Sequence, residues 1–266
     1  MFRHMSLQWI DGAAVEVDGE GEAVVLVHGL GGTSNNWTPV MGALARHRAI
    51  RPDLPGSGRS AGVEGELSIE RFVDCVKAVC DRLKVERAHF VGHSLGTIVC
   101  LHLAVLHPRL VRSLALFGPL LAPPDAARPN IAARGVKARS EGVAGMQAIA
   151  EAIVQAATSS DTKAHKPVTV ALVRESLMRQ DPEGYARSCE ALAAARPVDP
   201  ALIKAPTLLV TGEDDAVAPP QSVRALGDRI SGSRVVVYPR CGHWTTYERP
   251  EECARELREF LASQPR

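Results

Sequence analysis

The sequence has no surplus of charge of either sign. Its 31 Lys and Arg residues oppose 30 Asp and Glu residues, which leaves a formal net charge of +1 at pH 7. Proteins that bind nucleic acid concentrate basic residues to meet the phosphates. The balanced charge therefore argues against nucleic acid as a partner.

Long apolar runs and paired cysteine motifs are also absent. No stretch approaches the run of about 20 apolar residues that a membrane helix needs, and residues 1–6 lack the continuous apolar segment of a secretory signal. Met5 is an alternative start. The six cysteines show no C-x-x-C spacing. We expect a soluble, cytoplasmic protein with reduced thiols that is a monomer or a homodimer.

One stretch, Val91-Gly92-His93-Ser94-Leu95-Gly96, joins an apolar run to a segment with helical spacing. Strand, sharp turn and helix are the context in which G-x-S-x-G places a serine on a strained turn. The two glycines remove the Cβ atoms that would clash as strand and helix approach closely. The pattern predicts a nucleophile at Ser94, and a surface turn that fits the short pattern by chance is the alternative.

A glycine-rich loop follows an earlier strand pattern. The β-branched run over 23–27 is typical of a strand buried on both faces, and His28-Gly29-Leu30-Gly31-Gly32 follows it. The spacing matches neither common phosphate-binding motif, so a nucleotide site is disfavoured. Beside G-x-S-x-G, such a loop is typical of an oxyanion hole, with the backbone N–H groups of Leu30 and Leu95 as donors. We expect His28 to order the loop by hydrogen bonding.

Strand and helix patterns alternate over residues 1–121 and 201–266, which predicts an α/β core with a mostly parallel sheet and helices on both faces. Residues 122–200 are rich in alanine and show helical spacing without a strand pattern. Pro123-Pro124 and Arg196-Pro197 bound this stretch. We interpret it as a helical lid inserted into the core.

Shorter patterns complete the expected core. The alternation over 7–17 predicts a hairpin at a sheet edge. A helix is expected from Trp37 to Arg46, capped by one of residues 34–36, and Ser68 is expected to begin another helix. Asp53 precedes a glycine turn and is expected to cap it.

Ser94, Asp215 and His243 each follow a predicted strand. Their order along the chain is that of α/β-hydrolases and differs from the chymotrypsin and subtilisin orders. The chain resembles the α/β-hydrolase superfamily over nearly its whole length, which implies the α/β-hydrolase fold. Residues 183–207 and 218–220 are most similar to 3-oxoadipate enol-lactonases and related carboxylesterases.

The chemistry accounts for these residue types. A serine hydroxyl is a poor nucleophile, so an imidazole must take its proton as it attacks a carbonyl. We expect His243 to be that base and Asp215 to orient it. Asp214 is the nearest rival, and the family pattern Gly-x-x-Asp selects Asp215. Dehalogenases and epoxide hydrolases of the superfamily carry Asp where this chain has Ser94, so both of these activities are disfavoured.

The substrate is less clearly indicated. Tyr185 is the only aromatic residue in the predicted lid, which argues against an aromatic cage. Trp37, Tyr185 and Trp244 are expected near the pocket. Aliphatic side chains would line it, and arginines would bind an anionic lactone. The candidates are Ile131, Met146, Ile149, Ile153 and Leu172, and Arg134, Arg139, Arg174 and Arg187.

Together these patterns predict a serine hydrolase that cleaves a small carboxylic ester or lactone through an acyl-enzyme. No His, Cys and Glu cluster has the spacing of a metal site, so we expect no metal and no cofactor. A C–C bond hydrolase or an acyltransferase would use the same three residues. A hydrolase-fold receptor for a small molecule is the alternative outside enzymes.

Overall fold

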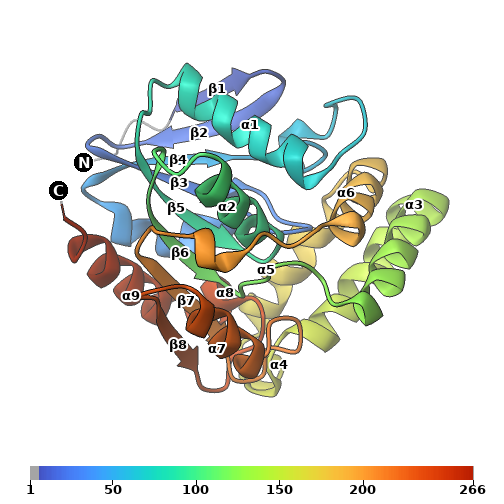
Figure 1. Ribbon diagram of the computed structural model, residues 1–266. Helices are drawn as coiled ribbons and strands as arrows, with labels where there is room; N and C mark the ends of the chain where they lie inside the picture. The colour runs from blue at the N-terminus through green and yellow to red at the C-terminus, as the bar shows by residue number, and fades with distance from the viewer. Residues whose placement is uncertain (1–5, 266) are drawn as a thin grey trace.

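The computed structural model describes residues 6–265, so the alternative start at Met5 lies outside the described residues. An eight-stranded sheet has the order β1-β2-β4-β3-β5-β6-β7-β8 (Figure 1). Pairs β1–β2 and β2–β4 are antiparallel, and all others are parallel. The strands are β1 (Ser6–Ile10), β2 (Ala13–Asp18), β3 (Glu22–Val27), β4 (His47–Pro52), β5 (Ala88–His93), β6 (Val111–Phe117), β7 (Thr207–Gly212) and β8 (Arg234–Tyr238).

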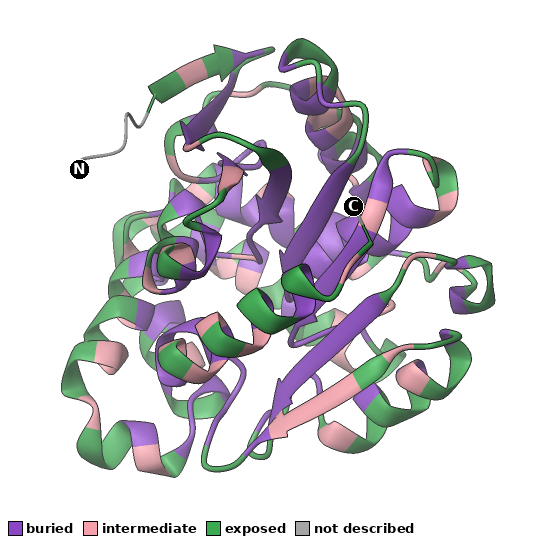
Figure 2. Cartoon of the chain, turned by 90° about the vertical axis from the view of Figure 1, so that its left-hand side faces the viewer, coloured by how far each residue is buried: buried purple, intermediate pink, exposed green. Residues whose placement is uncertain are grey.

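Helices cover both faces of the sheet. One face carries α1 (Ile69–Arg82), α2 (Leu95–Leu106) and α7 (Pro220–Arg229), and the other carries η1 (Ser34–Leu44) and α9 (Pro250–Ala262). Because alternate strand residues point to opposite faces, Val25 joins the first apolar cluster and Val24 the second. The central strands are almost wholly buried, whereas β8 at the edge is half-exposed (Figure 2). The predicted architecture and the edge hairpin are confirmed.

All of the regular secondary structure between β6 and β7 is helical. It contains η3 (Asp125–Ala127), α3 (Arg128–Ala157), α4 (Ser160–His165), α5 (Pro167–Met178) and α6 (Pro182–Ala194). We call residues 125–194 the helical insertion. Its helices α3 and α6 pack side by side and project beyond the sheet (Figure 1). The description of 122–200 as a lid stays a prediction.

Short helices complete the chain: η2 (Gly58–Ser60), η4 (Pro200–Leu202) and α8 (Thr245–Glu248). Within residues 6–265, no helix is long and apolar enough to cross a bilayer. All six cysteines are free.

Two helix starts test the predicted caps. Ser68 caps α1, because its hydroxyl accepts a hydrogen bond from the N–H of Arg71. The helix expected over 37–46 is instead a 3₁₀ helix over Ser34–Leu44, capped by Thr33. Thr33 and Asn36 form a reciprocal capping box, which begins the helix earlier, and Pro39 contributes no N–H inside it.

The turn from β5 into α2 is closely packed against β3. A Cβ atom at Gly96 would overlap the carbonyl oxygen of Val27, and one at Gly92 would lie 2.8 Å from the carbonyl oxygen of Gly96. Neither neighbour is the end of a flexible side chain. The sharp turn therefore depends on glycine at both positions.

Gly96→Ala should destabilise the protein by about 3 kcal/mol or more, because backbone must move to admit one methyl group. Urea unfolding measures the loss. Gly42→Ala is the matched control, since nothing lies within 4 Å of a Cβ atom there, and it should leave the free energy of unfolding unchanged or raise it by up to about 1 kcal/mol. Equal effects of the two substitutions would contradict this account of the turn.

Candidate active site

Ser94 occupies a strained turn at the carboxyl end of β5. Its φ of 52° and ψ of −120° lie where residues other than glycine are rare. Three hydrogen bonds hold this conformation: the N–H of Ser94 donates to Phe117, while its carbonyl accepts from the N–H and the hydroxyl of Thr97. The serine is therefore fixed at the start of α2, and it is 9% exposed.

Asp215 and His243 meet at the carboxyl ends of β7 and β8. His243 Nδ1 lies 2.9 Å from Asp215 Oδ2, and Asp215 Oδ1 accepts from the N–H groups of Val217 and Ala218. Burial alone would raise the pKa of Asp215, but His243 and these donors lower it by more. Because an ionised carboxylate only accepts hydrogen bonds, Nδ1 carries the proton. Asp214 is exposed, so the structure brings Asp215, and not Asp214, to His243.

Phe117 and Gly118 connect this pair to Ser94. The N–H of Ser94 donates to Phe117, and a Cβ atom at Gly118 would lie 2.8 Å from His243 Cε1. His243 Nε2 is buried and has no hydrogen-bond partner within residues 6–265. Nδ1 of His243 is thus hydrogen-bonded to Asp215, and Nε2 is available to accept a proton.

His93 fixes the backbone of His243, a role that the sequence analysis missed. Its Nε2–H donates to the carbonyl of His243 at 2.9 Å, and the two rings lie 5.0 Å apart. Burial and the nearby His243 lower the pKa of His93 to about 3, so His93 is neutral at pH 7. Its position between Gly92 and Ser94 was the available signal.

The loop after β3 lies beside Ser94. A Cβ atom at Gly29 would be 2.8 Å from Ser94 Cβ. The carbonyl of Gly29 accepts from Gly32 N–H at 3.0 Å and from His28 Nδ1–H at 2.8 Å. Since the peptide unit is planar and trans, the N–H of Leu30 points away from both donors.

The second expected donor, the N–H of Leu95, begins α2 and so has no partner within the helix. His28 keeps its ring orientation because Nε2 accepts from the N–H of Leu54. The expectation that His28 orders the loop is confirmed.

Asp53 is a structural cap, as expected. Its Oδ1 accepts from the N–H of Ser34 at 2.8 Å, and its Oδ2 accepts from the N–H and Nε of Arg59. Burial alone would raise the pKa of Asp53, but Arg59 and its other partners lower it by more. The Asp53 carboxylate is fully engaged in joining its own loop to η1.

The helical insertion packs directly on the loop beside Ser94. Ser176 and Gln180 both donate to the carbonyl of Gly31, at 2.8 and 3.2 Å. The amide oxygen of Gln180 also accepts from the N–H of Gly58. Gln180 thereby bridges two loops of the core, and its sequence context gave no indication of this.

The three aromatic residues expected near the pocket differ in their surroundings. Trp37, within η1, is wholly buried in the core beneath α9 and lies edge-on to Phe117, and its place near the pocket stays a prediction. Tyr185 is buried against Gly31. Trp244 lies 5.5 Å from the His93 ring and stacks on Tyr247.

Of the four candidate arginines, three have their guanidinium groups engaged away from Ser94. Arg139 pairs with Glu183 and Glu190, and Arg174 pairs with Glu151. Arg187 donates to the carbonyls of Val63 and Gly65. Arg134 lies near Tyr185, where its charge opposes the rise that burial causes in the tyrosine pKa. Arg134 is therefore the candidate cation adjacent to a predicted pocket residue.

The aliphatic candidates are mostly packing residues. Ile131, Met146 and Ile149 are buried in the core, whereas Leu172 is 44% exposed. Leu172 lines a surface groove of about 290 Å³ together with Thr33 and Tyr247. These surroundings do not support Leu172 as part of an enclosed pocket.

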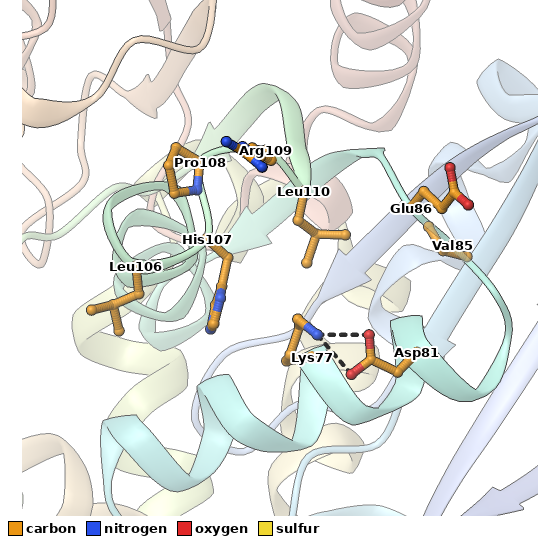
Figure 3. Close-up of a pocket in the computed structure, with 9 residues that line it drawn as sticks. All are labelled: Lys77, Asp81, Val85, Glu86, Leu106, His107, Pro108, Arg109 and Leu110. Atoms are coloured by element: carbon orange, nitrogen blue, oxygen red, sulfur yellow. Dashed lines mark hydrogen bonds and ion pairs between the residues drawn. The ribbon is translucent and has the colours of Figure 1, made fainter.

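A hollow of about 380 Å³ lies at the opposite end of α2 from Ser94 (Figure 3). It is bordered by the residues after α2 and by α1, including the ion pair of Lys77 and Asp81. Leu106, which borders the hollow, is twelve positions after Ser94 along the helix, a rise of about 18 Å at 1.5 Å per residue. Within the described residues, no group of three His, Cys, Asp or Glu side chains could hold a metal ion.

The fold agrees with comparisons to known proteins. The sequence profile described as the alpha/beta hydrolase fold matches residues 22–250. The chain belongs to the α/β-hydrolase family. It is 31% identical over 255 residues to a 2-hydroxy-6-oxo-2,4-heptadienoate hydrolase of Pseudomonas putida, covering 92% of this chain and 91% of that protein.

Two solved structures are similar over almost the whole chain. The enol-lactonase from Burkholderia xenovorans LB400 superposes with a TM-score of 0.88 at 30% identity, covering 97% of this chain and 100% of that one. A thermophilic esterase from Thermogutta terrifontis also gives 0.88, at 27% identity, with 98% of each chain covered. These relatives are hydrolases, which supports the assignment of this chain as a hydrolase enzyme.

Because His93 is neutral in the folded protein, we expect the free energy of unfolding to depend on pH. Its pKa is about 3 in the folded protein and about 6.5 in an unfolded chain. Between these values the unfolded chain binds the additional proton, so the free energy of unfolding falls as pH decreases below about 6.5. His93→Gln should reduce this slope by up to about 1.4 kcal/mol per pH unit, measured by urea unfolding. The exposed His165→Gln is the control, and a slope equal to wild type in His93→Gln would refute the prediction.

Proposed function

We propose that the protein is a serine hydrolase that cleaves a small carboxylic ester or lactone through an acyl-enzyme on Ser94. One observation carries the proposal: Asp215 holds His243 at Nδ1, while Nε2 is buried and unpartnered within residues 6–265. A neutral imidazole in this tautomer can take a proton at Nε2. Ser94, on its strained turn, is the nucleophile of the proposal.

The proposed reaction begins as Ser94 Oγ attacks the carbonyl carbon and its proton passes to His243 Nε2. The bond between the carbonyl carbon and the leaving oxygen then breaks, and the His243 imidazolium gives its proton to that oxygen. Water attacks the acyl-enzyme by the same route, releasing the acid and restoring Ser94. Asp215 stays ionised and stabilises the imidazolium.

The oxyanion of each intermediate would bind to the N–H groups of Leu30 and Leu95. Support comes from the orientation of the Gly29–Leu30 peptide, which His28 and Gly32 fix through the carbonyl. Each such donor contributes on the order of 3 kcal/mol to the transition state. The donors are held in place before substrate binds, so little reorganisation accompanies the reaction.

In this proposal, residues 122–200 form the lid of the substrate pocket. Support comes from Ser176 and Gln180, whose hydrogen bonds to the carbonyl of Gly31 join the helical insertion to the proposed oxyanion loop. Tyr185 and Trp244 would border the acyl group, and Arg134 would be the cation for an anionic lactone.

A C–C bond hydrolase is the second candidate. The observation that favours it is the 31% identity with the heptadienoate hydrolase of Pseudomonas putida. The lactonase and esterase similarities favour carboxylic esters and lactones. The same three side chains would serve both reactions. The reactions differ in the leaving atom that takes the proton from His243, which is oxygen in ester hydrolysis and carbon in C–C bond hydrolysis.

Ser94→Ala should lower kcat by about 10⁶-fold on a p-nitrophenyl ester. The wild type should carry a transient acyl group on Ser94, seen as a mass increase of that peptide. Exposed Ser140→Ala is the control and should retain activity. Testing lactones and β-diketones beside the ester distinguishes the two candidate reactions, and full activity of Ser94→Ala on every substrate would overturn both.

Asp215 and Asp214 form a natural matched pair of variants. Asp215→Asn should reduce kcat by about 10⁴-fold, because an amide no longer selects the imidazole tautomer that accepts at Nε2. Asp214→Asn should leave kcat near wild type, since that side chain is exposed. Steady-state kinetics measures both, and a greater loss in Asp214→Asn would contradict the assignment of the acid.

A further inference from the structure

Glu248 is a wholly buried acid that the proposed reaction does not use. It ends α8, and its carboxylate accepts four hydrogen bonds. Oε2 accepts from the N–H of Gly242 at 3.0 Å, the N–H of Ser159 at 2.9 Å and the hydroxyl of Thr162 at 2.8 Å, and Oε1 accepts from the N–H of Trp244 at 3.2 Å. The donors come from two separate segments of the chain.

One segment is the turn that carries His243. Glu248 binds the N–H groups on either side of that residue, at Gly242 and Trp244. The N–H of His243 donates to Ala157, and its carbonyl accepts from His93. Every backbone N–H of residues 242–244 therefore has a fixed partner, so the turn has little freedom to move the imidazole.

The other segment is the junction of α3 and α4 in the helical insertion. Ser159 and Thr162 lie there, as does Ala157, whose carbonyl binds the N–H of His243. A Cβ atom at Gly242 would lie 2.7 Å from that same carbonyl. The insertion and the His243 turn are thus in backbone contact. Glu248 bonds to the backbone of both segments, while Arg249 joins Asp161 of α4 to the carbonyls of Pro239 and Arg240 earlier in the turn.

We propose that Glu248 is a positioning residue that sets the place of His243 by joining its turn to the helical insertion. This inference rests on the proposed function of His243. A carboxylate suits the site because it accepts at both oxygens, and four donors converge on it. An amide would place an NH₂ group against at least one of these N–H donors, leaving both without a partner.

The test compares Glu248→Gln with Glu251→Gln, a nearby exposed glutamate. The imidazole acts in every chemical step, and small displacements of a catalytic group are costly, so Glu248→Gln should lower kcat by about 100-fold. KM should change by less than about 2-fold, since Glu248 is not placed against the substrate. Glu251→Gln should match wild type in both.

Hydrogen exchange followed by mass spectrometry supplies a measurement that does not depend on any substrate. In Glu248→Gln, amide exchange should increase together in residues 240–247 and 157–163, while the central strands stay protected. Unchanged exchange in both segments would overturn the proposal. If the wild type cleaved none of the substrates, the proposed function would fail and exchange alone would decide this inference.

Thr162→Val keeps the proposal testable if Glu248→Gln does not fold. It removes one donor from the insertion and leaves the bonds of Glu248 to Gly242 and Trp244 in place. We expect kcat to fall roughly 5-fold with KM unchanged, and exchange to increase in residues 240–247. Wild-type kcat with wild-type exchange in Thr162→Val would overturn the proposal, because the Thr162 hydroxyl supplies the one side-chain donor among the four bonds of the Glu248 carboxylate.

Discussion

The close approach of β5, α2 and the loop after β3 is the constraint on which the site depends. Ser94 can hold a positive φ only because Phe117 and Thr97 bind its backbone on both sides. The absence of a side chain at Gly29 lets the neighbouring loop reach the serine. The same packing that strains Ser94 therefore brings the Leu30 peptide beside it.

Around this centre, side chains hold the loops near Ser94 and His243 through hydrogen bonds to the loop backbones. His28 fixes the Gly29 peptide, His93 fixes the carbonyl of His243, and Gln180 bridges Gly31 and Gly58. Such bonds satisfy buried polar groups that a loop cannot satisfy by itself. Two of these side chains are histidines whose pKa is lowered by burial, so they remain neutral partners at pH 7.

The sheet and the main elements of the site could be predicted from the sequence because their signals are local. Apolar runs marked the strands, and glycines around Ser94 and before Asp215 marked sharp turns. Glu248 and Gln180 could not be found in this way. Each accepts hydrogen bonds from donors that lie more than 80 positions away in the sequence, and no local pattern marks such a contact. The full burial of Trp37 was not evident either, since it depends on η1 turning the side chain into the core.

The connection between β6 and β7 has a consequence for how this fold can vary. The two strands are parallel neighbours, so the helical insertion leaves and re-enters the sheet at adjacent positions. Its outer helices could change in length or composition without altering any strand pairing. The junction near Ala157 and the end of α5 are not so free, because they bond to the backbone around His243 and Gly31. Variation among homologous chains should therefore accumulate in the projecting parts of the packed helices α3 and α6 and spare the parts of the insertion that touch the core.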